Sequence, residues 1–325
     1  MASGVCRTFE RKRNRRGDGV NAELWGVRFE EYLRARGRSE RTIGGLLCDA
    51  RHFLGFLEDR GVTEPHQLTR QEVEAYQVSL LHRRKPNGDP VSIRTRYSKV
   101  SAVLRFLRFL HQTKVILVNP GRDIQQSRLP RKLLPKLPTV EEVERLLEEP
   151  DVATPLGLRD RAILEVLYSS ALRNGELRRL RLEDLDLERL QLRLCDSKGR
   201  KSRVVPLGEP AAAWVEEYLR SGRSYFLRQR DPGYLFVSLR GNGLSVTALT
   251  NLVSRYAQAV KLSAKVTPHT LRHCCATHML ARKAGIRHLQ ELLGHASPET
   301  TQVYTQVDLC DLRAVHQQCH PRESF

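Results

Sequence analysis

The sequence lacks a long apolar run. No segment approaches the roughly 20 consecutive apolar residues that an α-helix needs to cross a bilayer. The arginine-rich N-terminus also lacks the apolar core of a secretory signal peptide. We therefore expect a cytoplasmic or nucleoid-associated protein.

The seven cysteines lack a regular spacing. Their number is odd, their positions are scattered, and no C-x-x-C pair occurs. This usage fits a reducing compartment better than a disulfide-stapled scaffold. A cysteine-based zinc site is disfavoured as well, because such sites usually carry closely spaced cysteine pairs.

Acidic residues are few relative to basic ones, with 37 Asp and Glu against 55 Lys and Arg and a net charge of +18. Basic side chains that neutralise phosphates release counterions, so this excess favours a polyanionic partner, nucleic acid first. Membrane-surface binding would need a concentrated basic amphipathic helix, whereas this charge is spread along the chain. A soluble protein that happens to be basic remains the alternative.

The length of 325 residues allows two domains, each with a core of its own. Composition and periodicity divide the chain into a basic disordered tail at 1–20, a helical domain at 21–118, a linker at 119–138 and a second domain at 139–325. The tail either contacts DNA backbone or is a solvated leader. The linker has four prolines and five basic residues, which favour a semi-rigid, positively charged connection.

Apolar residues three or four positions apart predict four helices in the first domain, at 24–36, 41–60, 70–82 and 92–112. Ser39, Thr69 and Ser92 stand at N-cap positions. Two of the helices carry polar and basic residues that suit phosphate contacts or groove insertion, and we predict them as DNA-binding: Arg41, Thr42, Arg51, Arg94, Thr95, Arg96 and Lys99. A solvated helix face would explain either set taken alone.

The second domain mixes helices with a small sheet. Thr139 and Glu142 form a capping box, and further helices are expected at 158–170, through 181, at 209–221 and at 245–260. Alternating residues at 190–194 and 202–207 predict a β-hairpin with Lys198 and Lys201 at its tip, and a third strand is expected at 234–238. The remainder is predicted helical through about 318, with breaks at Gly285, Gly294 and Pro298.

The stretch from 267 to 305 carries side chains suited to phosphate chemistry. Metal-free cleavage of a phosphodiester requires a nucleophile, a proton donor for the leaving oxygen and fixed positive charge. His269 and Arg272 are three apart and share a helix face, and Tyr304 follows nine positions after His295. A metal site made of His269, His273 and His278 is the rival interpretation, although no carboxylate stands at ligand spacing.

Five motifs resemble the tyrosine recombinase (phage integrase-like) family. They are ALRNGEL at 171–177, SKGRKSRVVPL at 197–207, HTLRH at 269–273, LLGH at 292–295 and TTQVYT at 300–305. LPKLPTVEEVERLL at 134–147 and LRAVHQQCHPR at 312–322 are most similar to Xer-type recombinases. The resemblance therefore extends across nearly all of residues 22–325.

The resemblance implies a role for each catalytic position. Arg173 and Arg272 would clamp the phosphate, Tyr304 would be the nucleophile, and Lys198 would be the general acid. His269 would assist proton transfer and His295 would hydrogen-bond the scissile phosphate. Glu176 would support the helix of the first arginine, and Lys201 would contact the DNA backbone.

The resemblance also implies a mainly α fold, with a helical core-binding (SAM-like) domain followed by a mixed α/β catalytic domain with a small antiparallel sheet. The reaction would be transesterification through a 3′-phosphotyrosyl intermediate, without metal or other cofactor. Four protomers would act on two double-stranded DNA sites, possibly with a second recombinase, and the C-terminal helix near 308–318 would dock on a neighbour or pack on its own domain. The rival functions are a non-catalytic DNA-binding protein on the same scaffold and a DNA-relaxing topoisomerase.

The chain departs from the family pattern at three places. Ala171 stands where glycine is usual, so the tight turn before Arg173 must form without it. Asn174-Gly175 replaces a more apolar pair that ends in serine, and Gln306 replaces a common histidine. None of the three removes a predicted catalytic group.

Overall fold

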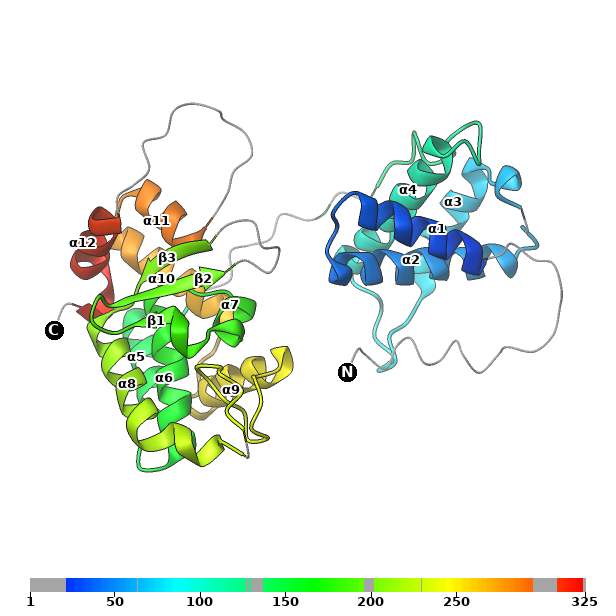
Figure 1. Ribbon diagram of the computed structural model, residues 1–325. Helices are drawn as coiled ribbons and strands as arrows, with labels where there is room; N and C mark the ends of the chain where they lie inside the picture. Colours follow the sequence, from blue (N-terminus) through cyan, green and yellow to red (C-terminus); the bar gives the residue numbers. More distant parts are fainter. Residues whose placement is uncertain are drawn as a thin grey trace. The chain divides into compact units, whose positions relative to one another are not determined.

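The chain folds into two compact units, Met1–Lys132 and Leu133–Phe325, in a computed structural model (Figure 1). The structure describes residues 22–62, 64–126, 129, 137–195, 202–228, 230–294 and 309–323. No helix within these ranges is both long enough and apolar enough to span a membrane.

The first unit is helical, as predicted, and its described residues form α1 (Ala22–Ala35), α2 (Glu40–Glu58), α3 (Arg70–His82), α4 (Ile93–Gln112) and the short 3₁₀ helix η2 (Pro65–Gln67). The helix starts follow the predicted caps. The Ser39 hydroxyl accepts a hydrogen bond from the Thr42 backbone N–H, and Ser92 does the same for Thr95. Thr69 forms a capping box with Glu72.

Aromatic side chains form much of the core of this unit. The Phe29 ring of α1 packs edge-on against Phe106 of α4 at 5.3 Å between centroids, and Phe53 of α2 packs against Tyr76 of α3 at 5.1 Å. All four rings are at most 2% exposed. Such edge-to-face contacts add directional preference to the hydrophobic burial that joins the helices.

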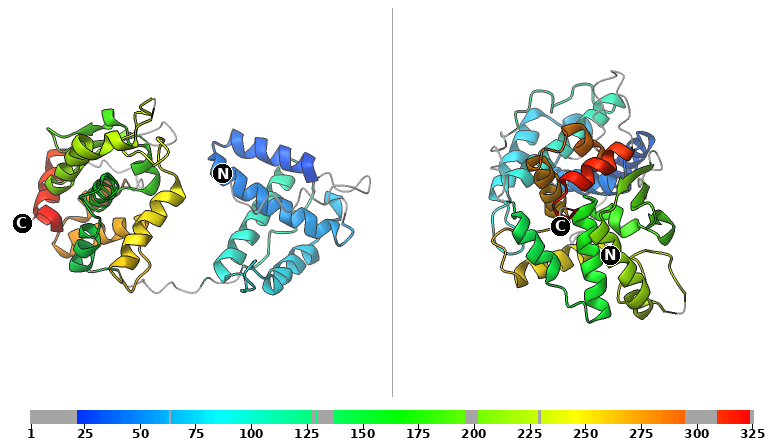
Figure 2. Two further views of the ribbon diagram at one scale, coloured as in Figure 1. Left: turned by 90° about the horizontal axis from the view of Figure 1, so that it is seen from below. Right: turned by 90° about the vertical axis from the view of Figure 1, so that its left-hand side faces the viewer.

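The second unit is built around α6 (Pro155–Ser169), which is buried along almost its whole length. Figure 2 (left) looks nearly along this helix, with other helices of the unit around it. The helix begins three residues earlier than predicted, because Thr154 caps it and Pro155 occupies its first turn. The other described helices are α5 (Val140–Glu148), α7 (Asn174–Arg179), α8 (Glu209–Glu217), α9 (Val246–Ala259), α10 (Pro268–Ala281), α11 (Ile286–Leu293) and α12 (Leu309–Cys319).

Four short helical turns complete the described helical structure of this unit: η3 (Leu182–Asp184), the π-type turn η4 (Tyr218–Gly222), η5 (Arg223–Phe226) and η6 (Pro321–Glu323).

A three-stranded antiparallel sheet lies beside these helices in the order β1 (Leu185–Asp186), β2 (Gln191–Cys195), β3 (Ser202–Pro206). The β2–β3 pairing confirms the predicted hairpin, and Leu192 lies opposite Val205 in its register. β1 was not predicted, because two residues are too few to show an alternating pattern. The hairpin tip at 196–201 lies outside the described residues.

The strand expected at 234–238 is wrong. Its residues make only single bridges, Arg181 with Tyr234 and Val237 with Gly243. Leu235, Phe236 and Val237 are all buried in succession, whereas a sheet with one solvated face buries alternate residues. The segment 234–238 is therefore an irregular, buried stretch of the core, which we call the strap.

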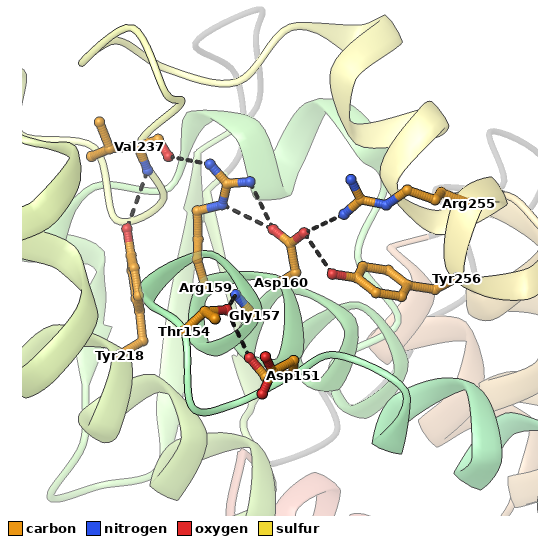
Figure 3. A network of polar contacts seen from close by, with 9 residues as sticks. All are labelled: Asp151, Thr154, Gly157, Arg159, Asp160, Tyr218, Val237, Arg255 and Tyr256. Carbon is orange, nitrogen blue, oxygen red and sulfur yellow. Dashed lines mark hydrogen bonds and ion pairs between the residues drawn. The ribbon is translucent and has the colours of Figure 1, made fainter. Parts of the chain in front are cut away.

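A buried ionic network secures α6 to α9 and to that strap (Figure 3). The Asp160 carboxylate is fully buried and accepts hydrogen bonds from Arg159, from Arg255 at 2.8 Å and from the Tyr256 hydroxyl at 3.0 Å. Arg159 in turn donates to the Val237 carbonyl oxygen at 3.1 Å. Burial, and then the charge of Asp160, raise the pKa of Tyr256 to about 12, so its hydroxyl stays a donor. A buried carboxylate is tolerated when it is paired and hydrogen-bonded in this way.

Candidate active site

Arg173 stands at the N-cap of α7 and is held by the carboxylate of Glu176, three residues further on. Its backbone N–H donates to Glu176 Oε2 at 2.8 Å, and its Nη1 donates to Glu176 Oε1 at 2.8 Å. Its Nη2 donates to the Gly294 carbonyl oxygen at 3.1 Å. The side chain is still 46% exposed. Arg173 is thus both oriented and accessible to a ligand.

Arg272 lies one turn into α10, which begins at the Thr267 cap with Pro268 in its first turn. Its Nη1 donates to the Ala171 carbonyl oxygen at 2.6 Å, and its Nη2 donates to the Leu293 carbonyl oxygen. Burial, and then the positive charge of Arg173, lower the pKa of Arg272 to about 10. The guanidinium therefore remains charged at neutral pH in a site with little solvent.

Glu176 joins the two arginines to a third one. Its Oε1 accepts from both Arg173 and Arg203 at 2.8 Å, and its Oε2 lies 3.9 Å from Arg272 Nη1. Burial alone would raise the pKa of Glu176, but hydrogen bonds from Arg203 and Arg173 outweigh it and hold that pKa below its ordinary value. Three guanidinium groups against one carboxylate leave a net charge of 3 − 1 = +2 in the cluster.

The turn before Arg173 forms without the usual glycine. Ala171 adopts a left-handed backbone with φ of +49° and is completely buried. That conformation costs a non-glycine residue roughly 1–2 kcal/mol. It directs the Ala171 carbonyl oxygen to Arg272, so the substitution keeps the geometry of the motif at a local energetic cost.

The three histidines of the rival metal site do different things. His269 and His273 are exposed on α10, with their ring centroids 4.6 Å apart. His278 is buried, and its Nε2 donates to the Pro138 carbonyl oxygen at 3.1 Å while its Nδ1 accepts from the Tyr168 hydroxyl at 2.8 Å. Among the residues that the structure describes, no three His, Cys, Asp or Glu side chains gather as metal ligands would.

Arg203 is the member of the cluster to which the sequence analysis assigned no role. It lies within the SKGRKSRVVPL motif, two residues before the buried Val205, and this spacing on a strand could have indicated that the two side chains share a face.

Four predicted site residues lie outside the described residues: Lys198, Lys201, His295 and Tyr304. Two described residues of the cluster adjoin these positions in the sequence. Arg203 stands two positions after Lys201. Gly294, whose carbonyl oxygen accepts a hydrogen bond from Arg173, directly precedes His295. The structure therefore brings together Arg173, Glu176 and Arg272, with His269 one turn before Arg272 on the same helix.

The predicted DNA-binding residues of the first unit differ in their surroundings. Five of the seven are exposed, namely Arg41, Thr42, Arg51, Arg94 and Thr95, while Arg96 and Lys99 are partly covered. Lys99 already binds Asp49 at 2.6 Å between its ammonium and the carboxylate. The two threonine hydroxyls contact the capping serines, Thr42 with Ser39 and Thr95 with Ser92.

α12 packs on its own unit, where Leu312 is buried. His316 Nε2 donates to the Ser169 carbonyl oxygen at 2.8 Å, and Arg322, just after the helix, donates to the buried Glu165 carboxylate at 2.8 Å. Docking of this helix on a neighbouring protomer stays a prediction.

Comparison with known proteins gives matches in both units. Residues 137–309 match the Phage integrase family, and residues 27–114 match the Phage integrase, N-terminal SAM-like domain. Tyrosine recombinase XerC 2 of Ralstonia nicotianae is 38% identical over 90% of this chain and 84% of its own length. Tyrosine recombinase XerD of Listeria innocua is 34% identical over 88% of this chain and 95% of its own.

Two solved structures share the fold. A lambda integrase (75–356) dimer bound to a COC′ core site has a TM-score of 0.65 at 18% identity, covering 88% of this chain and 99% of that one. XerH site-specific recombinase bound to difH substrate, in a pre-cleavage complex, has a TM-score of 0.64 at 18% identity, covering 92% and 82%. Both likenesses support the mainly α architecture with its small sheet.

Proposed function

Because this chain belongs to the phage integrase family and is a site-specific tyrosine recombinase, we propose that Tyr304 attacks a DNA phosphate held by Arg173 and Arg272. The observation that supports this proposal most directly is the arginine cluster around Glu176. One carboxylate fixes an exposed guanidinium and lies beside a buried one, and the cluster keeps a net positive charge.

The two arginines suit a phosphate whose charge grows during attack. A guanidinium offers paired N–H donors that match phosphate oxygens and stays charged. Two nitrogens of Arg272 donate hydrogen bonds to the carbonyl oxygens of Ala171 and Leu293, and these bonds fix the direction of the guanidinium before DNA binds. Preorganised donors of this kind lower the barrier because they need no reorganisation during the reaction.

The chemical step exchanges one ester for another. The Tyr304 oxygen forms a bond to phosphorus as the bond from phosphorus to the 5′-oxygen breaks, and a 3′-phosphotyrosyl ester results. His269 takes the phenolic proton, Lys198 gives a proton to the departing 5′-oxygen, and His295 hydrogen-bonds the phosphate. Attack by a 5′-hydroxyl of the other site reverses these steps and rejoins the strand. The ester conserves the bond energy, so the balanced reaction consumes no nucleotide.

Both units contribute to DNA binding in this proposal. The exposed Arg41, Thr42, Arg51, Arg94 and Thr95 contact the duplex from the first unit, with Arg96 and Lys99 nearer its core. Lys201 adds a backbone contact from the hairpin. The linker at 119–138 joins the two units, and its basic residues lie along the DNA. The net charge of +18 supports a large phosphate footprint and a nucleoid-associated protein.

The assembly that we propose is a homotetramer on two sites. Exchange of both strands of two duplexes requires four cleavages, and each chain carries one nucleophile. α12 would dock on a neighbour in that assembly. The related fold of a lambda integrase tetramer bound to a Holliday junction is compatible with this arrangement.

The test uses a nicked duplex that traps the covalent intermediate by losing the cleaved fragment. Wild-type protein should form a protein–DNA adduct that survives denaturation, whereas Tyr304→Phe should form none and bind the same DNA within about twofold. Exchange between two labelled sites then separates recombination from relaxation of a single duplex. Binding without any adduct would favour a non-catalytic DNA-binding protein and contradict the catalytic assignment.

A further inference from the structure

Arg203 connects the sheet to the phosphate-binding arginines. It lies on β3, opposite Leu194 of β2, two positions after Lys201. Its Nη1 donates to Glu176 Oε1 at 2.8 Å, the same oxygen that accepts from Arg173. The carboxylate that orients the clamp is thus held from the hairpin side as well.

The same guanidinium packs against the C-terminal end of α11. Gly294 ends that helix in a left-handed conformation with φ of +58°. A Cβ at position 294 would lie only 2.8 Å from Arg203 Cζ. Arg173 and Arg272 bind the carbonyl oxygens of Gly294 and Leu293. Three arginines therefore surround the helix end, where the backbone carbonyls carry partial negative charge.

Among the described residues, Nη1 is the one nitrogen of Arg203 that has a hydrogen-bond partner. Its Nε and Nη2 atoms are buried and have no hydrogen-bond partner within the part of the chain that the structure describes. Burying unpaired donors carries a desolvation cost that an apolar side chain of similar length would avoid. The charged hydrogen bond to the buried Glu176 carboxylate offsets that cost, and the same carboxylate oxygen orients Arg173.

We propose that Arg203 is a positioning residue for the reaction, which rests on the proposed function of Tyr304 and the arginine clamp. It holds the Glu176 carboxylate in the orientation that directs Arg173 at the phosphate, and it ties β3 to the same carboxylate. Without it, Arg173 alone would hold Glu176 Oε1, and the clamp and the hairpin would move independently. Small displacements of this kind slow a chemical step strongly.

The experiment compares Arg203→Met, Arg203→Lys and Arg193→Met on the nicked substrate. Arg203→Met should slow adduct formation at saturating enzyme about tenfold or more, because the carboxylate loses its second anchor. Arg203→Lys keeps one charged donor for Glu176 and should recover most of the rate. Arg193 is an exposed arginine on β2, so Arg193→Met should match the wild type.

DNA affinity and thermal stability are measured on the same proteins. Arg203 is bound to Glu176 and only 24% of its side chain is exposed, so its loss should leave the Kd within about twofold of the wild type. In a Glu176→Gln background, Arg203→Met should add little further loss, because Arg203 acts through Glu176. Coupling in the rate of adduct formation, at an unchanged melting temperature, is a readout that a merely structural role would not produce.

Three outcomes would overturn the proposal. Arg203→Met could cleave at the wild-type rate at saturating enzyme, or its DNA affinity could fall well beyond twofold, which would indicate a direct phosphate contact. The cleavage rate could also fall in both Arg203 variants by an amount that parallels their loss of melting temperature, which would indicate a structural role. Wild-type protein that forms no adduct would instead contradict the proposed function, so the two failures are distinguishable.

Discussion

The guanidinium of Arg272 donates a 2.6 Å hydrogen bond to the carbonyl oxygen of Ala171, which lies in a left-handed turn 101 positions earlier. This bond joins the two arginine motifs of the chain directly. The turn that presents Arg173 to the site is thereby fixed by the other half of the clamp. We therefore expect a substitution at either residue to alter the positions of both.

Position 171 tests the cost of the turn. Ala171→Gly should change the free energy of unfolding by no more than about 1 kcal/mol, because relief of backbone strain offsets the entropy of glycine. Ala171→Val should lower it by about 2–4 kcal/mol, since a β-branched residue resists positive φ and the larger side chain must fit a completely buried site. Urea denaturation measures both. A valine variant as stable as the wild type would contradict the left-handed turn.

Arg272→Lys tests the need for two directed bonds. A single ammonium cannot reach both the Ala171 and Leu293 carbonyl oxygens and still face a phosphate. We expect adduct formation to slow by about 100-fold with DNA affinity nearly unchanged. Arg282→Lys, at an exposed position that ends the same helix, is the matched control. Equal rates for the two variants would show that only the charge matters.

The network in Figure 3 predicts an asymmetry between its two sides. Asp160→Asn leaves the buried Arg159 without its counter-charge and should destabilise the second unit by about 3 kcal/mol. Arg255→Met removes a side chain that is 58% exposed and should cost less than about 1 kcal/mol. Urea unfolding of both variants checks the ranking, and equal losses would mean that the network is not anchored at Asp160.

His316 predicts a pH-dependent attachment of α12. Burial lowers the pKa of His316 to about 4, while an unfolded histidine has a pKa of about 6.5. The unfolded chain therefore binds more protons between these values. The stabilising contribution is complete above about pH 6.5 and is lost as pH falls toward 4.

Hydrogen exchange in α12 between pH 7.5 and 5 measures this effect. Exchange should become relatively faster at low pH after correction for the intrinsic rate. Buried His320, stacked on His316, has its pKa lowered in the same direction and adds to the trend. His316→Gln can still donate to the Ser169 carbonyl oxygen but cannot titrate in this range, so its pH dependence should be weaker. An unchanged slope in that variant would exclude His316 as its source.

Local signals were sufficient for most helices. N-cap residues such as Ser39 and Ser92 and the capping box at Thr139 mark helix starts that depend on neighbours within three residues. The β2–β3 hairpin is equally local, since its strands are separated by six residues and alternate in character. Such features depend on neighbouring residues and can be predicted without knowing how the rest of the chain folds.

Long-range contacts decided what local signals could not. The strap at 234–238 has strand-like residues, but its surroundings bury three of them in a row, so no ladder forms. Burial of α6 on all sides likewise depends on elements far away in the chain.

The sequence by itself determined the family, the mainly α architecture and the residue types of the site, because motif spacing and helix periodicity are local properties. Tertiary structure decided that Arg173, Arg203 and Arg272 share one carboxylate and one helix end. Charge assembled from three separate elements depends on packing, since only the folded core brings their backbones within hydrogen-bonding reach and compensates for the repulsion between them.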